Sequence, residues 1–157
     1  MKTRKGEIMI QLKCRHIDET HALGMRLGEC LQPGMVCTLT GYLGVGKTTF
    51  TKGIGAGLGI NRTINSPTFT IVKQYQGRCP FIHIDAYRME NVEEDLGFDE
   101  YFYGEYVTVV EWPEMIQDQL PKERLDITIL HLSDHVRTFL FAPKGKQYER
   151  ICEGLKG

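Results

Sequence analysis

A glycine-rich run that ends in lysine is the group of residues with the clearest chemistry in the sequence. Residues 41–48 read Gly-Tyr-Leu-Gly-Val-Gly-Lys-Thr and fit the pattern G-x-x-x-x-G-K-[S/T] without a mismatch. The glycines let the backbone curl so that successive N–H groups point into one concavity, and the N-terminus of the next helix adds its positive end. Lys47 would charge-pair with the β- and γ-phosphates, and the Thr48 hydroxyl would ligate Mg²⁺. The spacing predicts a phosphate-binding P-loop, and the alternative is a glycine-rich turn with an incidental lysine.

Two acids at the ends of apolar stretches could complete such a site. Hydrolysis requires an acid that holds the metal shell and a group that positions water. Asp85 ends the apolar stretch 81–85, and Glu111 directly follows the apolar residues 107–110. Parallel strands that end at one sheet edge would bring Glu111 beside Asp85 and Thr48. We interpret Asp85 as a metal-shell acid and Glu111 as a metal ligand or water-orienting base. The alternatives are a turn aspartate and a simple surface acid.

Other residues near these motifs have two interpretations each. Trp112 could stack on a nucleotide base or pack in the core. Residues 66–70, Ser-Pro-Thr-Phe-Thr, could form a loop that senses the γ-phosphate through a hydroxyl, or an ordinary Ser-Pro turn. His83 is expected to point away from its apolar neighbours and has no assigned partner. His131 and His135 are expected to be surface residues rather than metal ligands.

Length, charge and cysteine content restrict the class of protein. The chain has 157 residues, 41% of them apolar and 25% charged, which predicts one globular domain over residues 1–157. With 19 basic and 20 acidic residues the net charge is -1, so the chain has no strong field to attract RNA or an anionic membrane. Five cysteines without a Cys-x-x-Cys pair predict buried reduced thiols. Without a signal peptide, or an apolar run near the roughly 20 residues of a membrane helix, a cytoplasmic protein is expected.

The elements before and after the P-loop follow from hydrophobic periodicity. Residues 7–13 alternate as in a half-buried strand, and 35–40 form a strand buried on both faces. Asp18 is the expected N-cap of a helix that runs to about Leu31. Its expected apolar face consists of Ala22, Leu23, Leu27, Cys30 and Leu31. Residues 48–58 predict a helix in which Gly53 and Gly57, four apart, pack against a neighbouring backbone.

The second half of the chain predicts further alternation of strands and helices. The expected elements are strands 69–75 and 80–84 as a hairpin, a short helix within 90–104, strand 107–110, a helix 113–120 that opens with Pro113, antiparallel strands 125–132 and 136–142, and a helix 146–155. This alternation predicts an α/β protein with a three-layer, P-loop NTPase-like fold around a mixed, partly parallel sheet.

Four motifs together resemble those of the TsaE (YjeE) family. They are residues 41–49, residues 66–70, the segment His-Ile-Asp-Ala-Tyr-Arg at 83–88, and Glu111-Trp112. Their order and spacing match from the helix start at 18–20 to Arg137, which is nearly the whole chain. Members of this family are the ATPase subunit of the bacterial complex that makes threonylcarbamoyladenosine in tRNA. The resemblance implies ATP and Mg²⁺ as cofactors, slow hydrolysis, TsaD and TsaB as partner subunits, tRNA reached only through the complex, and no membrane.

The resemblance also implies roles for individual residues. Lys47, Asp85 and Glu111 would be catalytic, and Thr48, Glu111 and Asp85 would lie at the metal. The nucleotide would be bound by Gly41, Leu43, Gly44, Val45, Gly46, Lys47, Thr48 and Thr49, with Thr20, Trp112 and Arg137 nearby. Ser66, Pro67, Thr68 and Phe69 would form a switch-like loop. Tyr42 stands where the family usually has an acidic residue, which changes the charge near the phosphates.

Two other functions use the same phosphate cradle. A small-molecule P-loop kinase usually requires an arginine-bearing lid over the donor phosphates, and the sequence has no arginine-rich loop. A GTP-dependent switch requires an Asn-Lys-x-Asp guanine-binding motif, which the sequence does not contain. The absence of an acid after Asp85, where Ala86 stands, favours an ATPase with slow turnover on its own.

Overall fold

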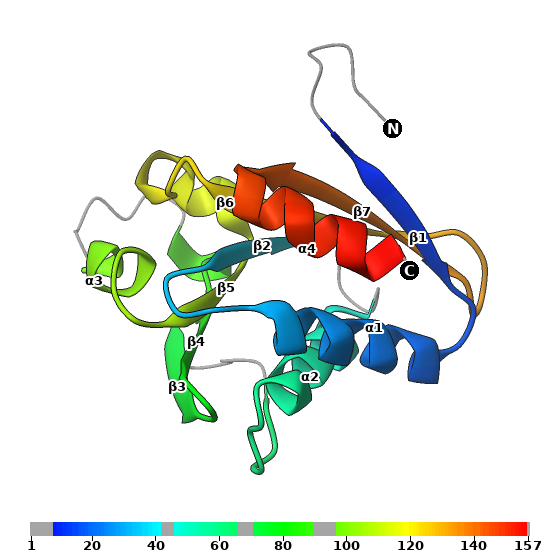
Figure 1. The fold of residues 1–157 in the computed structure, drawn as a ribbon, viewed down its shortest axis with the longest axis horizontal. Coiled ribbons are helices and arrows are strands. Elements are labelled where there is room, and N and C mark those ends of the chain that lie inside the picture. The colour runs from blue at the N-terminus through cyan, green and yellow to red at the C-terminus, as the bar shows by residue number, and fades with distance from the viewer. Residues whose placement is uncertain (1–7, 42–45, 66–70, 90–96, 157) are drawn as a thin grey trace.

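A mixed sheet runs through the centre of the molecule (Figure 1). The computed structural model describes residues 8–41, 46–65, 71–89 and 97–156, and within these ranges seven strands form one sheet. The strands are β1 (Ile10–Cys14), β2 (Val36–Thr40), β3 (Val72–Gln76), β4 (Pro80–Asp85), β5 (Val107–Glu111), β6 (Arg124–His131) and β7 (Arg137–Lys144), in the order β1-β7-β6-β2-β5-β4-β3. The central strands β6, β2, β5 and β4 are parallel, whereas β1, β7 and β3 pair antiparallel. The predicted mixed, partly parallel α/β sheet is therefore confirmed.

Helical elements cover both faces of this sheet. On one face lie α1 (Ile17–Cys30), α2 (Lys47–Gly57) and α4 (Lys146–Lys156), whose buried side chains share one hydrophobic cluster with the strands. On the other face lie the short helix α3 (Phe98–Phe102) and the 3-10 segments η1 (Tyr87–Met89) and η2 (Pro113–Gln119). Figure 1 shows α1 and α2 side by side, away from α3. The three layers expected from the sequence are thus present.

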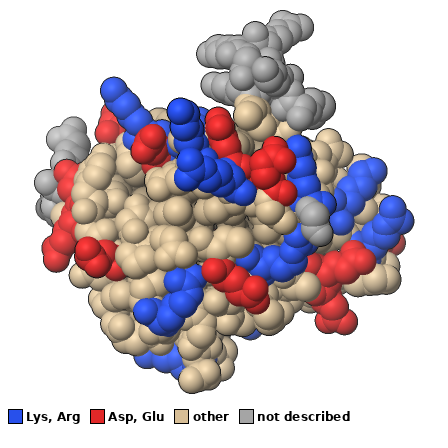
Figure 2. Space-filling model, in the orientation of Figure 1, with Lys and Arg blue, Asp and Glu red and all other residues tan. Residues whose placement is uncertain are grey.

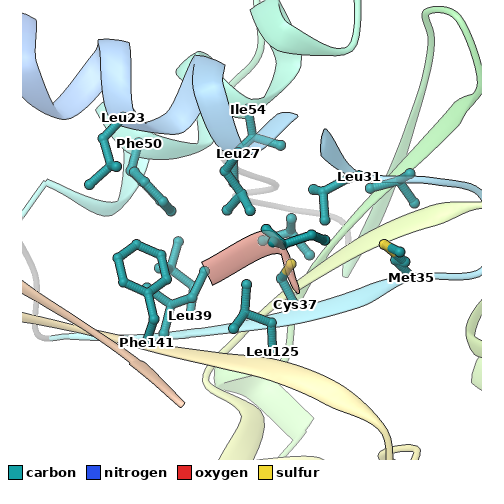
Figure 3. Packing of buried hydrophobic residues seen from close by; sticks show 14 of the residues in the cluster. Leu23, Leu27, Leu31, Met35, Cys37, Leu39, Phe50, Ile54, Leu125 and Phe141 are labelled. Carbon is teal, nitrogen blue, oxygen red and sulfur yellow. The ribbon is translucent and has the colours of Figure 1, made fainter. Parts of the chain in front are cut away.

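Side chains along β2 point alternately to the two faces of the sheet and so pack in different hydrophobic clusters. Cys37 and Leu39 belong to the cluster under α1 and α2, whereas Val36 belongs to the cluster on the other face. Figure 3 shows side chains of α1 and α2 pointing toward Cys37, Leu39 and Leu125, and Leu27 and Ile54 are fully buried there. Burying a side chain of this size stabilises the fold by about 1.5–3 kcal/mol. The core thereby fixes the heights of α1 and α2 over the sheet.

Glycines bring α1 and α2 into backbone contact. A Cβ added at Gly53 would lie 2.3 Å from the carbonyl oxygen of His21, and one at Gly57 would lie 2.2 Å from that of Met25. Gly24 and Gly28 on α1 have the reciprocal contacts, with Phe50 and Ile54 of α2. The close packing predicted for Gly53 and Gly57 is confirmed, and it leaves α2 no room to shift on α1.

The buried face of α1 differs from the predicted one. Ala22 and Cys30 are exposed, and the helix begins at Ile17 after the cap residue His16 rather than after Asp18. The face of α1 that packs on α2 contains Gly24 and Gly28, since small residues permit the close approach. This orientation leaves Ala22 and Cys30 exposed to solvent. The other four cysteines are buried, and all five are free thiols, as predicted except for the exposure of Cys30.

Two predicted elements have different bounds or geometry. The first strand begins at Ile10 and extends to Cys14, beyond the predicted end at residue 13. The segment after Pro113 is a 3-10 helix interrupted at Ile116, whose φ of -131° is not helical. The hairpin of β3 and β4, the pair β6 and β7, and the C-terminal helix agree with the predictions. Among the described residues, none of the helices combines the length and the hydropathy needed to span a membrane.

Candidate nucleotide-binding site

The predicted P-loop connects the central strand β2 to α2. Gly41 follows the end of β2 at Thr40, and α2 begins at Lys47 after its cap residue Gly46. Gly46 has a φ of 114°, a left-handed conformation that glycine adopts without strain. A helix N-terminus presents N–H groups without acceptors in the helix, and the helix dipole favours an anion there. The predicted residues Tyr42, Leu43, Gly44 and Val45, and the switch-like residues Ser66, Pro67, Thr68 and Phe69, lie outside the described ranges.

Strand pairing brings the two predicted acids together. Asp85 at the end of β4 is the register partner of Glu111 at the end of β5, and Leu39 of β2 flanks Glu111 on its other side. The backbone N–H of Ala86 donates to the carbonyl of Glu111 at 3.0 Å, which continues the pairing past the strand ends. Both acids therefore lie at the same sheet edge as the start of the P-loop, as the sequence predicted.

Lys47 is buried against this edge. Its Nζ lies 3.8 Å from Glu111 Oε1 and 4.5 Å from the centre of the Trp112 ring. Lys47 is 7% exposed and Glu111 5% exposed, so both charges are largely removed from water and depend on each other. Thr48, the next residue of α2, is exposed. The arrangement couples the lysine of the P-loop to the acid of a strand more than sixty residues away in the sequence.

His83 is a residue of this site that sequence reasoning missed. It is 1% exposed, and its Nε2 lies 2.6 Å from Glu111 Oε2. His83 does point away from Ile82 and Ile84, as expected, but it points into the buried site under α2. The spacing contained the signal, because Phe81, His83 and Asp85 alternate with the isoleucines and so share one face of β4.

Burial governs the ionisation of Asp85. Removal of its carboxyl group from water raises the pKa above the ordinary value of 3.8, and the charge of Glu111 adds to this rise. The N–H of Tyr87, which donates to Oδ1 at 3.0 Å, and the charges of His83 and Lys47 act in the opposite direction. Within the part of the chain that the structure describes, Asp85 is thus a carboxylate whose burial is only partly offset by its neighbours.

Two hollows flank the ends of the P-loop. One of about 250 Å³ gathers four predicted nucleotide-binding residues, since it is lined by His16, Ile17, Thr20, Gly46, Thr49, Asp134, His135 and Arg137. The other, of about 260 Å³, is lined by Thr40, Gly41, Lys47, Trp112, Glu114, Thr128, Ile129 and Leu130. His131 and His135 are both exposed, as predicted.

Trp112 is packed on several sides. Its backbone is left-handed, with a φ of 57°, its ring lies 4.9 Å from that of Tyr87, and it packs against the hydrophobic cluster that contains Ile116. Trp112 therefore packs partly against the core, which is one of its two interpretations, and it also contacts Lys47. Stacking on a base stays a prediction.

The acids do not form a complete metal cage. Within the described ranges no group of three or more His, Cys, Asp or Glu side chains could hold a metal ion. Mg²⁺ usually keeps water ligands and binds through one or two carboxylates together with phosphate oxygens. Asp85, Glu111 and the exposed Thr48 fit that donor set when a phosphate is also present.

The strand order, the helix on the central strand and the glycine loop between them define an α/β protein with a P-loop-like fold. A family model described as "Threonylcarbamoyl adenosine biosynthesis protein TsaE" matches residues 14–139, and the chain belongs to the TsaE family. It is 51% identical over 150 residues to the tRNA threonylcarbamoyladenosine biosynthesis protein TsaE of Bacillus subtilis (strain 168), covering 94% of this chain and 95% of that protein. The corresponding protein of Treponema pallidum (strain Nichols) is 39% identical over 130 residues, covering 82% and 96%.

A solved structure is also similar over nearly the whole chain. The crystal structure of Bacillus subtilis YdiB superposes with a TM-score of 0.82 at 42% sequence identity, covering 96% of this chain and 95% of that one. The resemblance drawn from the four sequence motifs is therefore confirmed at the level of the family and the fold.

Proposed function

We propose that this chain is an ATP-binding, slowly hydrolysing subunit that supports threonylcarbamoyladenosine modification of tRNA together with TsaD-like and TsaB-like partners. Membership of the TsaE family and the names of its relatives support the role in tRNA modification. One observation carries the ATPase part of the proposal. Lys47 opens α2 at the end of a glycine loop and is buried 3.8 Å from Glu111, an acid at the end of a neighbouring parallel strand.

The residues of the site have complementary roles in this proposal. Lys47 and the N–H groups at the start of α2 bind the phosphates, and Thr48 and the acids Asp85 and Glu111 hold Mg²⁺ or orient water. Bound Mg²⁺ would contribute neutralisation of charge on the phosphate oxygens. The hollow beside Thr20, Thr49 and Arg137, which is lined by both polar and apolar residues, receives the nucleoside part in this proposal.

The pairing of Lys47 with Glu111 supports slow turnover of the chain alone. Lys47 must leave Glu111 and the face of Trp112 before its ammonium group reaches a phosphate. Separating two buried opposite charges costs free energy until new partners replace the old ones. A partner subunit that favours the separated arrangement would therefore accelerate hydrolysis, which is the stimulation we expect from TsaD-like and TsaB-like proteins.

Surface charge supports indirect contact with tRNA. Figure 2 shows Lys and Arg side chains interspersed with Asp and Glu side chains over the visible face, and the whole chain has a net charge of -1. Affinity for nucleic acid comes largely from positive charge that neutralises phosphates. In the proposed complex, the partner subunits supply most of that charge.

The single tryptophan provides a direct test of ATP binding. Trp112 lies next to Lys47, so its fluorescence should change when Mg²⁺-ATP draws Lys47 away, and calorimetry should give the same affinity. K47A should weaken binding by about 100-fold or more, because a charge-assisted contact to phosphate is lost. K52A, which removes an exposed lysine of the same helix, is the matched control and should bind normally. Absence of binding to the unsubstituted chain, or normal binding by K47A, would refute the ATPase proposal.

A second measurement tests the partnership. The hydrolysis rate of the chain is compared with and without the TsaD-like and TsaB-like subunits at saturating Mg²⁺-ATP. We expect a clear rise in their presence, and equal rates would contradict the proposed partnership while leaving ATP binding intact.

A further inference from the structure

His83 has an arrangement that a purely structural core residue would not require. Its ring is 99% buried between the sheet and α2, with Nε2 at 2.6 Å from Glu111 Oε2. Its other ring nitrogen, Nδ1, is buried and has no hydrogen-bond partner among the described residues. Leaving a buried polar atom unpaired costs about 1–3 kcal/mol. An apolar side chain would avoid that cost, so the histidine is explained by what its Nε2 does.

The hydrogen bond has one possible direction when Glu111 is ionised. A carboxylate only accepts, so Nε2 carries the proton and donates to Oε2. The other carboxylate oxygen, Oε1, faces Lys47 Nζ at 3.8 Å. The two oxygens of Glu111 thus have separate partners, the imidazole on one side and the P-loop lysine on the other.

We infer that His83 is a positioning residue that holds the Glu111 carboxylate with Oε1 directed toward the P-loop, ready for Mg²⁺ or a water once Lys47 engages phosphate. This inference rests on the proposed function and adds a residue to it. Side chains that hydrogen-bond a ligating carboxylate fix its orientation, and losing one typically costs 10–100-fold in metal affinity or activity, of which we expect about the lower figure here. His83 itself touches neither the P-loop nor Asp85 in any hydrogen bond or ion pair within the described residues.

Three substitutions of His83 distinguish the effect of losing its hydrogen bond to Glu111 from the effect of changing the volume of its ring. Glutamine places its amide nitrogen at the same bond separation from Cα as histidine Nε2, so H83Q can still donate to Glu111. Asparagine places its amide nitrogen at the position of Nδ1, so H83N falls short. H83F keeps an aromatic ring beside Phe81, whose ring centre lies 6.3 Å from that of His83, and removes the donor. Thermal melting of all three variants establishes that each is folded at the assay temperature.

The decisive readout is the Mg²⁺ dependence of the Trp112 signal. At a fixed ATP concentration, the Mg²⁺ concentration at half-effect should rise about 10-fold in H83F and H83N and stay within about threefold of the unsubstituted chain in H83Q. ATP binding measured with EDTA should differ little among them, because Lys47 and the start of α2 are unchanged. A role limited to packing would instead leave the Mg²⁺ midpoint unchanged while lowering the melting temperature.

Each outcome decides the inference. Unchanged Mg²⁺ midpoints in H83F and H83N, or an H83Q midpoint raised as far as theirs, would overturn the positioning role while the proposed function stands. If H83F does not fold, the comparison of H83N with H83Q decides in the same way. Failure of all three to fold would make His83 a core residue and overturn the inference. Absence of any ATP response in the unsubstituted chain would refute the proposed function first, and this inference with it.

Discussion

Two carboxylate clusters in the same sheet shift the pKa of an aspartate in opposite directions. Asp126 on β6 accepts a hydrogen bond from Thr38 Oγ1 at 2.6 Å and from Arg124 Nε at 2.9 Å, and it pairs with Lys144 Nζ at 3.0 Å. Burial opposes its ionisation, but the bonds from Thr38, Lys144 and Arg124 outweigh burial and hold the pKa of Asp126 below its usual value of 3.8. This cluster lies within the sheet, on strands β2, β6 and β7.

The cluster at the end of β4 and β5 is incompletely paired by comparison. Among the described residues, Asp85 accepts a hydrogen bond from the N–H of Tyr87, and its pKa is raised by burial and by Glu111. Glu111 has His83 at hydrogen-bond distance but Lys47 only at 3.8 Å. Among the described residues, Asp126 has three side-chain partners, two of them cationic, whereas Asp85 and Glu111 retain more capacity for another ligand. Spare acceptor capacity next to the glycine-rich loop favours a binding site here over a structural ion pair.

The largest expected effect is on Glu111. E111Q keeps the shape of the side chain and can still accept a hydrogen bond from His83, but it removes the negative charge. Hydrolysis measured with the partner subunits should fall by about 100-fold or more, while ATP binding followed by Trp112 fluorescence persists. D126N is the matched control in the other cluster and should hydrolyse at the normal rate. Undiminished hydrolysis by E111Q would show that the acid has no catalytic part.

D126N should lower stability instead of activity. Loss of a half-buried charge with three polar partners should reduce the free energy of unfolding at pH 7 by about 2 kcal/mol, because Arg124 and Lys144 lose their anionic partner. Since the folded pKa is depressed, the stabilisation by Asp126 is present above pH 3.8 and is lost as the pH falls through the folded pKa. Urea unfolding of D126N and of the unsubstituted chain, measured from pH 7 to pH 3, should show the difference in their free energies of unfolding decrease. Equal stability at pH 7 would contradict this description of the cluster.

The hydroxyl of Thr38 should account for a part of that effect. T38V removes the donor to Asp126 and should cost about 1 kcal/mol by urea unfolding. The matched control is T108V, because Thr108 is fully buried on the adjoining strand and its hydroxyl has no hydrogen-bond partner among the described residues. T108V should be neutral or stabilising, and a loss for T108V equal to that for T38V would assign the effect to packing.

The smallest expected effect is an increase in stability, for the substitution D85N. D85N keeps the Oδ1 acceptor for the N–H of Tyr87 and removes a charge that burial disfavours. Because the folded pKa of Asp85 is raised, the ionised group costs stability above that pKa, so D85N should melt about 1–2 °C higher at pH 7. The difference in melting temperature between D85N and the unsubstituted chain should narrow as the pH falls toward 3.8 and should vanish below it, because Asp85 is then protonated in both the folded and the unfolded state. A lower melting temperature for D85N at pH 7 would show that Asp85 is already well paired.

Local patterns predicted the elements and much of the candidate site. The P-loop pattern correctly placed the start of α2, and the apolar stretches ending in Asp85 and Glu111 correctly predicted strands that end side by side. The buried face of α1 was predicted wrongly at Ala22 and Cys30, because hydrophobicity alone does not show that α2 approaches through Gly24 and Gly28. The predicted roles of Thr20, Thr49 and Arg137 are untested, although the structure gathers these residues around one hollow.

The sequence by itself determined the position of the glycine-rich loop, the strand and helix periods, and the family, because each depends on residues close together in the chain or on motifs in a fixed order. Only the tertiary structure decided that His83 contacts Glu111, that Lys47 lies near both Glu111 and Trp112, and that the pKa of Asp126 is lowered while that of Asp85 is raised. These contacts depend on the strand order β6-β2-β5-β4, which sets residues far apart in the chain side by side. The protonation and bonding of a carboxylate follow from those neighbours and from burial, so no local pattern specifies them.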